Sequence, residues 1–362
     1  MNFKERVFAV LRHEEPDQVP FSHYCTPTEP PPGGEFEREL RNKGMGYKAW
    51  SYTVSSVMPN VTTETHVQGN ILTTTYHTPV GDVTTKIRTD QKRTHRHAAL
   101  NLEWMIKDVA DYDPVIYMIE DAVYSMNETL FYQTERDLGG DGVVNDSISC
   151  SPYEMSWSYF GQQKWFSEQL RHPHEFEKLL KALEKRVDKT MSLIMNSPAE
   201  IVNLGSINGF YGPRQFEKYD LPFYKKYTDL LHARGKLCMV HAHSINLRFL
   251  KDLIPKTGLD VIESFTLPPI GNLSVEEARR AWGDRIVIWA GFPDPVLYWE
   301  VEEIRKYTES ILKSEWASYG FLMGMQEQGL NGIIDDRSEF YVKRGLRTVM
   351  DIINKHSRHK CK

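Results

Sequence analysis

Apolar and polar positions in the second half of the chain follow two alternating patterns. Short runs of apolar residues are each followed by a longer segment in which apolar residues recur at helical spacing. The longer segments predict helices at residues 215–233, 247–256, 275–282, 301–313 and 339–353. The short runs predict strands at residues 201–204, 237–241, 260–262, 286–289 and 321–323. Strands that alternate with helices in this way pair in parallel through right-handed crossovers.

The first part of the chain is patterned differently. Residues 3–11 carry apolar side chains on one helical face, and an apolar stretch at residues 143–148 predicts an upstream strand. Residues 62–89 are rich in Thr, Val and Ile, alternate over short stretches and are interrupted by turn sequences, which predicts an antiparallel β-meander. Helical patterns resume from about residue 101. Residues 26–34, rich in proline and glycine, predict an ordered loop over a pocket.

We therefore predict an α/β fold, a (β/α)8 TIM barrel with a small antiparallel β-meander inserted near its N-terminus. Residues 1–362 would form this single barrel domain, with the meander at residues 62–89 as its insertion. Barrel closure takes eight units, so those not visible in the second half must lie upstream. An open doubly wound sheet is the competing fold. The chain has neither G-x-G-x-x-G after a strand nor G-x-x-x-x-G-K-[ST], so dinucleotide and P-loop sites lose their main support.

Composition limits the classes of partner. The 362 residues carry 44 Lys and Arg against 49 Asp and Glu, and this net charge of -5 disfavours a general nucleic-acid or membrane surface. No apolar run approaches the ~20 residues that a membrane helix needs. The four cysteines are scattered without a C-x-x-C pair, which fits a reducing compartment and predicts a cytoplasmic protein. Oligomeric state is left open, with a homodimer as one alternative and residues 315–319 and the meander as candidate contact surfaces.

Functional groups of a parallel barrel lie at the carboxyl ends of its strands. His241 and His243 end one predicted strand two residues apart, so they face the same side and can share a metal ion. Glu263 ends the next strand, where it can be a third ligand or a general acid or base, and Glu327 follows the last strand. We predict that His241, Glu263 and Glu327 are catalytic and that His241, His243 and Glu263 hold the metal. The alternative for each side chain is a bond to core or loop backbone.

Neutral polar side chains follow two neighbouring strands and suit the binding of a polar organic group. Asn145 ends the upstream strand, and Asn203, Asn208 and Tyr211 lie at and beyond the end of the next one. Trp289 ends a later strand and can contribute an aromatic wall. We predict that these five residues bind substrate. Helix capping and ordinary core packing are the alternatives.

Several segments carry a family resemblance. The opening, residues 3–20, reads FKERVFAVLRHEEPDQVP. Residues 221–241, 257–260 and 278–284 match later units of the same family in order along the chain. Together these segments resemble the uroporphyrinogen decarboxylase superfamily, and more closely its branch of corrinoid-dependent methyltransferases. The resemblance implies a (β/α)8 barrel over nearly the whole chain.

Two departures from the family pattern shape the functional expectation. Decarboxylases of the superfamily carry an arginine-rich RQAGRY-like segment after the first strand, whereas residues 22–27 contain no arginine, so a substrate with several carboxylates is disfavoured. Thiol methyltransferases of the branch hold zinc with His-x-Cys and a later Cys. Here the pair is His241-x-His243, and the later position falls near Met325 or Gln326. A site without thiolates is harder, and it suits an ether oxygen better than a thiol.

The resemblance implies a methyltransferase that moves a methyl group from a small methylated donor, such as a methoxylated aromatic, to the cobalt of a corrinoid protein. The implied cofactors are the corrinoid on that partner protein and zinc at the predicted metal site. The alternative is a decarboxylase of the same superfamily that acts on a smaller carboxylic acid, with Arg214 or Arg248 as its anchor. A third hypothesis is a non-catalytic barrel that binds a corrinoid or a metabolite.

Overall fold

The computed structural model describes residues 1–25, 33–89, 99–148, 150–242, 246–326 and 329–360. The chain divides into two compact units. Unit 1 comprises Met1–Thr53, Glu128–Ser147 and Ser197–Lys362, and unit 2 comprises Val54–Asn127 and Ile148–Asn196. The single domain over residues 1–362 stays a prediction. Among the described residues, no helix has the length and apolar character needed to span a bilayer.

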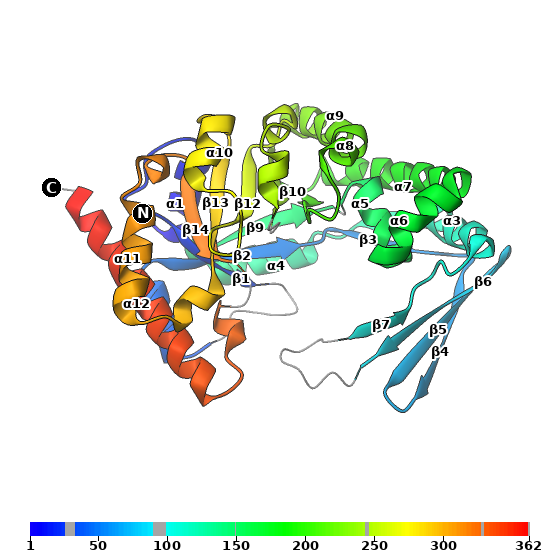
Figure 1. The fold of residues 1–362 in the computed structure, drawn as a ribbon, viewed down its shortest axis with the longest axis horizontal. Coiled ribbons are helices and arrows are strands. Elements are labelled where there is room, and N and C mark those ends of the chain that lie inside the picture. Colours follow the sequence, from blue (N-terminus) through cyan, green and yellow to red (C-terminus); the bar gives the residue numbers. More distant parts are fainter. Residues whose placement is uncertain (26–32, 90–98, 149, 243–245, 327–328, 361–362) are drawn as a thin grey trace. The chain divides into compact units, whose positions relative to one another are not determined.

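Unit 1 contains a closed barrel of eight parallel strands, which confirms the predicted fold (Figure 1). Around the ring the strands follow the order β1-β14-β13-β12-β11-β10-β9-β2, and every neighbouring pair is parallel. The strands are β1 Phe21–Cys25, β2 Met45–Ser51, β9 Gly142–Ser147, β10 Ile201–Ser206, β11 Leu237–His241, β12 Val261–Thr266, β13 Val287–Phe292 and β14 Phe321–Met325.

The helices of unit 1 follow the predicted alternation with two corrections. They are α1 Phe3–Leu11, α2 Glu35–Asn42, α4 Thr129–Leu138, α8 Pro213–Gln215, α9 Leu221–His232, α10 Val275–Trp282, α11 Val301–Leu312 and α12 Asp336–Lys360. The helix predicted at 215–233 is interrupted by a π-helical turn, Phe216–Asp220. The helix predicted at 247–256 is wrong: the segment forms two short 3₁₀ turns, Leu247–Leu250 and Ile254–Lys256. Pro255 lies in this segment, and a proline in a helix interior lacks the amide that the helix needs.

Unit 2 contains the predicted meander. Strands β4 Thr62–Gln68, β5 Ile71–Thr78, β6 Gly81–Arg88 and β7 Leu100–Glu103 form a four-stranded antiparallel sheet. The helical pattern predicted from about residue 101 is wrong at β7, because Glu103 binds Lys86 of β6 at 2.9 Å and pairing with β6 outweighs the local pattern. The remaining elements are β3 Val54–Val57, β8 Val123–Met126, α3 Tyr112–Asp121, α5 Pro152–Ser156, α6 Gln162–Arg171 and α7 Pro173–Ile194.

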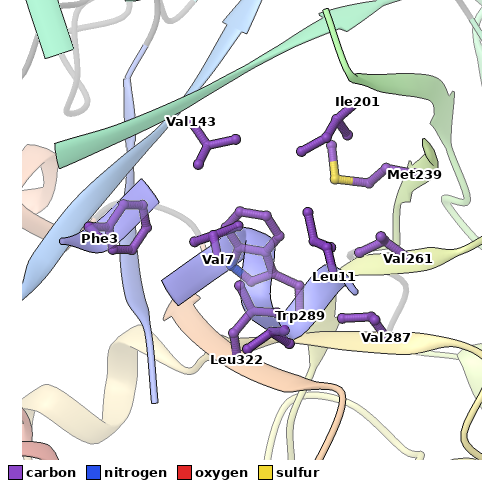
Figure 2. Close-up of a cluster of buried hydrophobic side chains, with 11 residues drawn as sticks. Phe3, Val7, Leu11, Val143, Ile201, Met239, Val261, Val287, Trp289 and Leu322 are labelled. Carbon is purple, nitrogen blue, oxygen red and sulfur yellow. The ribbon is translucent and has the colours of Figure 1, made fainter. Parts of the chain in front are cut away.

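Helix α1 fills the amino end of the barrel. Asn2 caps it by accepting a hydrogen bond from the Glu5 amide at 2.9 Å, while the Glu5 carboxylate accepts one from the Asn2 amide at 2.8 Å. Its apolar face packs against inward residues near the start of the strands, and Figure 2 shows this cluster: Phe3, Val7, Leu11, Val143, Ile201, Met239, Val261, Val287, Trp289 and Leu322. The half of the barrel nearest the amino ends of the strands is thus apolar core, so functional side chains are expected at the carboxyl ends.

The contact between Phe3 and β2 gives a stability prediction. A Cβ added at Gly46 would lie 2.0 Å from Cγ of the buried Phe3 ring. We expect Gly46→Ala to lower the free energy of unfolding by about 1–3 kcal/mol, because the helix must shift away from the strand. Gly33→Ala is the matched control, since nothing lies within 4 Å of its added Cβ. Equal melting temperatures for the two variants in thermal denaturation would contradict this packing.

Candidate active site

The strand register builds an inward layer of polar residues above the apolar core. Tyr24 of β1 pairs with Lys48 of β2, and His241 of β11 pairs with Glu263 of β12. In the ring order β2 lies opposite β12, yet the Lys48 Nζ and Glu263 Oε2 atoms are 2.7 Å apart. Side chains of opposite strands meet only when both point into the barrel. His241 and Glu263, which the sequence predicted, therefore meet Tyr24 and Lys48, which it did not, in the barrel interior.

Glu263 is the centre of this cluster. Its Oε2 accepts from His241 Nδ1 at 2.6 Å and contacts Lys48 Nζ at 2.7 Å, while its Oε1 accepts from the Tyr24 hydroxyl at 2.5 Å. Glu263 is 0% exposed and Lys48 is 1% exposed. A fully buried carboxylate is stable only when paired in this way, so four strands converge on one negative charge.

Electrostatics fix the protonation state of Glu263. Burial by itself would raise its pKa, but the neighbouring charges of Lys48 and His241 and their hydrogen bonds outweigh it and lower the pKa to about 2. Burial lowers the pKa of Lys48, and the charge of Glu263 opposes that shift. Glu263 is therefore a carboxylate at neutral pH. In this arrangement it can hold a cation or orient an imidazole, whereas a proton for a substrate must come from one of its partners.

Aromatic rings surround the Lys48 ammonium. It lies 4.2 Å from the ring centroid of Trp50, 5.1 Å from that of Tyr24 and 5.8 Å from that of Trp289. Tyr24 stacks on Trp50 with a centroid distance of 4.9 Å, and the Trp289 indole donates to Ser22 Oγ at 2.9 Å. The position of the Lys48 side chain in the barrel interior is thus fixed both by its ion pair and by these rings.

His241 lies at the solvent side of the cluster. Its ring meets Trp50 edge to face with centroids 5.7 Å apart, and its side chain is 16% exposed. Because Nδ1 is engaged by the Glu263 carboxylate, Nε2 is the ring atom that can exchange a proton with a ligand. A carboxylate bonded to Nδ1 fixes the imidazole tautomer and stabilises the protonated ring.

The backbone directly after Glu263 is irregular. Ser264 has φ 53°, and the pairing of β12 with β13 shifts register between Glu263 and Phe265. A residue other than glycine in this region is strained, and bulges of this kind re-aim side chains beside active sites. The register shift thus lies directly after Glu263, inside β12, which continues to Thr266.

The predicted substrate residues fall into two groups. Asn145, Asn203 and Trp289 lie on the inward face, as the pairing of Asn145 with Trp50 and of Glu263 with Trp289 indicates. Asn208 and Tyr211 lie in the segment after β10, where Asn208 donates to Ser206 Oγ at 3.0 Å and Tyr211 donates to Asp220. His243 and Glu327 lie outside the described residues, so their predicted roles stay predictions.

Sequence reasoning missed Tyr24, Lys48 and Trp50. A usable signal existed for Lys48, because it is a lone charge in the otherwise uncharged run Met45–Ser51. A charged residue inside a buried strand needs a partner, which marks it as a member of an interior cluster. The identity of that partner was not readable, since it depends on which strands face each other after closure.

Two members of the predicted metal set, His241 and Glu263, are bonded to each other, and Glu263 also contacts Tyr24 and Lys48. The third member, His243, lies outside the described residues, so the predicted metal site stays a prediction. The group with metal-ligand spacing among the described residues is His232, Cys238 and Asp260, at the amino ends of β11 and β12. There the Asp260 carboxylate accepts from the His232 ring and the Cys238 amide, both at 2.7 Å, and so ties α9 to these strands.

A parallel barrel that is plugged at its amino end and carries a buried charged cluster at its carboxyl end has the architecture of a (β/α)8 barrel enzyme. The family model of uroporphyrinogen decarboxylase (URO-D) matches residues 148–325. This match confirms the resemblance to the uroporphyrinogen decarboxylase superfamily seen in the sequence.

The fold also matches a solved structure. A methyltransferase from Methanosarcina mazei superposes with a TM-score of 0.54 at 12% sequence identity, covering 97% of this chain and 98% of that one. At this identity the likeness concerns the fold. No curated protein sequence matches the chain.

Proposed function

We propose that the protein is a methyltransferase that takes a methyl group from a small methylated donor, such as a methoxylated aromatic, and passes it to the cobalt of a corrinoid carried by a partner protein. The observation that carries this proposal is the His241–Glu263 pair, bonded at 2.6 Å at the carboxyl end of neighbouring strands. The likeness of the fold to the Methanosarcina mazei methyltransferase supports it.

The chemical difficulty is the leaving group. When the methyl carbon leaves an ether, the oxygen keeps the electron pair of the broken C–O bond and becomes an alkoxide or phenolate. The corrinoid, when bound, supplies from its reduced cobalt the electron pair that forms the new bond to carbon. The task of this chain is to neutralise the oxygen, and a positioned acid does this most directly.

In our proposal His241 is the residue that performs this task. In our proposal the protonated imidazole gives its Nε2 proton to the departing oxygen, while Nδ1–H stays on Glu263. The Glu263 carboxylate stabilises the charged ring beforehand and keeps the imidazole oriented afterwards. Water can restore the proton, since the side chain of His241 is partly exposed. Lys48 and Tyr24 act through Glu263 as positioning residues.

The test is a reconstitution. The purified protein is incubated with a corrinoid protein in its reduced state and a panel of methyl donors that includes methoxylated aromatics. Methylation of the corrinoid is followed by absorbance, and the demethylated product by chromatography. Failure of every donor would reject the proposed function, and release of carbon dioxide from an acid without corrinoid would favour the decarboxylase alternative.

Loss of the His241 imidazole should affect rate more than binding. We expect His241→Gln to lower kcat about 10²- to 10⁴-fold with a small change in KM, because a general acid acts in the transition state. His232→Gln is the matched control, since that histidine is at the amino end of the barrel. Equal loss of kcat in both variants, or a change confined to KM, would contradict the role of His241.

A further inference from the structure

We propose that the Oδ1 atoms of Asn145 and Asn203 share the hydrogen bond that a neutral hydroxyl of the substrate donates, which identifies the substrate as a hydroxylated methyl ether. This inference rests on the proposed function for the kind of substrate and on two side-chain oxygens for its recognition. The Oδ1 atoms of Asn145 and Asn203 are buried, and neither has a hydrogen-bond partner among the residues that the structure describes. Asn145 is 1% exposed and Asn203 is 6% exposed.

Buried carboxamide oxygens without a partner are uncommon, because each forfeits the hydrogen bonds that water would give it. The orientation of the Asn145 amide is fixed by its other end. Its Nδ2 donates to Ser147 Oγ at 3.1 Å and to the Asp146 carbonyl at 3.2 Å. Turning the amide over would set its oxygen against the Asp146 carbonyl oxygen, so the acceptor must stay where it is. The missing donor is then expected from a ligand.

The two acceptors belong to one part of the interior. They lie on the neighbouring strands β9 and β10, and Asn203 pairs with Ser147, the residue that holds the Asn145 amide. Trp50 flanks Asn145 on one side, and β11 with His241 follows β10 on the other. A substrate acted on by His241 would therefore place its neighbouring substituents beside this pair of strands.

The charge of the surroundings favours a neutral donor over an ammonium group. Trp50, the register neighbour of Asn145, already carries the Lys48 ammonium 4.2 Å from its ring. A second cation at the asparagines would be repelled by Lys48 within a region that water does not screen. A hydroxyl donates a hydrogen bond without that penalty. A methyl ether that carries a free hydroxyl meets both requirements.

The experiment compares 2-methoxyphenol with methoxybenzene, which differ by one hydroxyl. Dissociation constants are measured by ligand-observed NMR titration for the wild type, Asn203→Leu and Asn145→Leu. We expect the wild type to bind the hydroxylated ether about tenfold more tightly or better, and Asn203→Leu and Asn145→Leu each to lower that ratio. Since Asn203 Oδ1 has no described protein partner, Asn203→Leu should also keep its melting temperature.

Asn354→Leu is the matched control, because its Nδ2 donates to the Lys43 carbonyl at 2.8 Å and serves only the fold. It should lower the melting temperature and leave the binding ratio unchanged. A ratio near one in the wild type, no binding of either ether, or an unchanged ratio in both asparagine variants would overturn the inference. Discrimination without methyl transfer to a corrinoid would instead reject the proposed function and leave the role of the asparagines standing.

Discussion

Glu263→Gln should both unfold the barrel more easily and lower turnover. The substitution keeps the shape of the side chain but removes the only negative charge that contacts Lys48 in the described structure, so a buried ammonium loses its counter-charge. Removal of one partner from a buried ion pair costs about 3–5 kcal/mol. Activity should also fall, though by no more than in His241→Gln, because Glu263 acts through the imidazole that it orients. Chemical denaturation and the methyl-transfer assay measure the two effects.

The acid dependence of stability separates this explanation from general damage. The pKa of Glu263 falls from 4.5 in the unfolded chain to about 2 in the fold, so its contribution is complete above about pH 4.5 and is lost as the pH drops toward 2. In Glu263→Gln this part of the pH dependence should be missing between those values. Glu276→Gln is the control, because Glu276 is an exposed carboxylate paired with Arg280. If the two variants lose stability equally, the buried cluster does not have the role assigned to it.

Where a strand could be predicted from the sequence, the inward direction of its site residues could be predicted as well. Alternation along a strand places residues two apart on one face, so His241, Glu263, Asn145, Asn203 and Trp289 could be chosen from strand ends alone. Their inward direction needed no knowledge of the partners. The sequential order of the βα units also predicted that Glu263 would lie on the strand next to that of His241.

The connections across the barrel were not predictable. Lys48 meets Glu263 and Tyr24 meets His241 because β2 faces β12 and β1 faces β11 in the closed ring. Which strands face each other depends on their order around the ring. The long segment between β2 and β9 prevents the sequence from showing where β1 and β2 stand in that order. Without Lys48, Glu263 looked like an acid or a metal ligand, and with it the same side chain becomes a permanent anion. The role expected for Glu263 therefore changes because Lys48, which is distant in sequence, holds its side chain in the charged form.

The interdependence of Lys48 and Glu263 predicts a strongly non-additive double mutant. Lys48→Met alone leaves the Glu263 carboxylate buried with His241 and Tyr24 but without its ammonium, and we expect a loss of about 3–5 kcal/mol. Glu263→Leu alone leaves the Lys48 ammonium buried without a counter-charge, and it should lower the free energy of unfolding by a similar amount. The double variant removes both charges and replaces them with apolar groups among Trp50 and Trp289, so its loss should be well below the sum of the two.

Denaturant titration of the four proteins gives the coupling energy of this cycle. A matched surface cycle on Lys181 and Glu177, an exposed pair one helical turn apart, should give a coupling below about 1 kcal/mol. Additive losses in the Lys48 and Glu263 cycle would mean that the two charges do not depend on each other. A stable but inactive double variant would separate the roles of the pair: the barrel can then do without the buried charges, and the reason for keeping them is that His241 needs a carboxylate behind its ring.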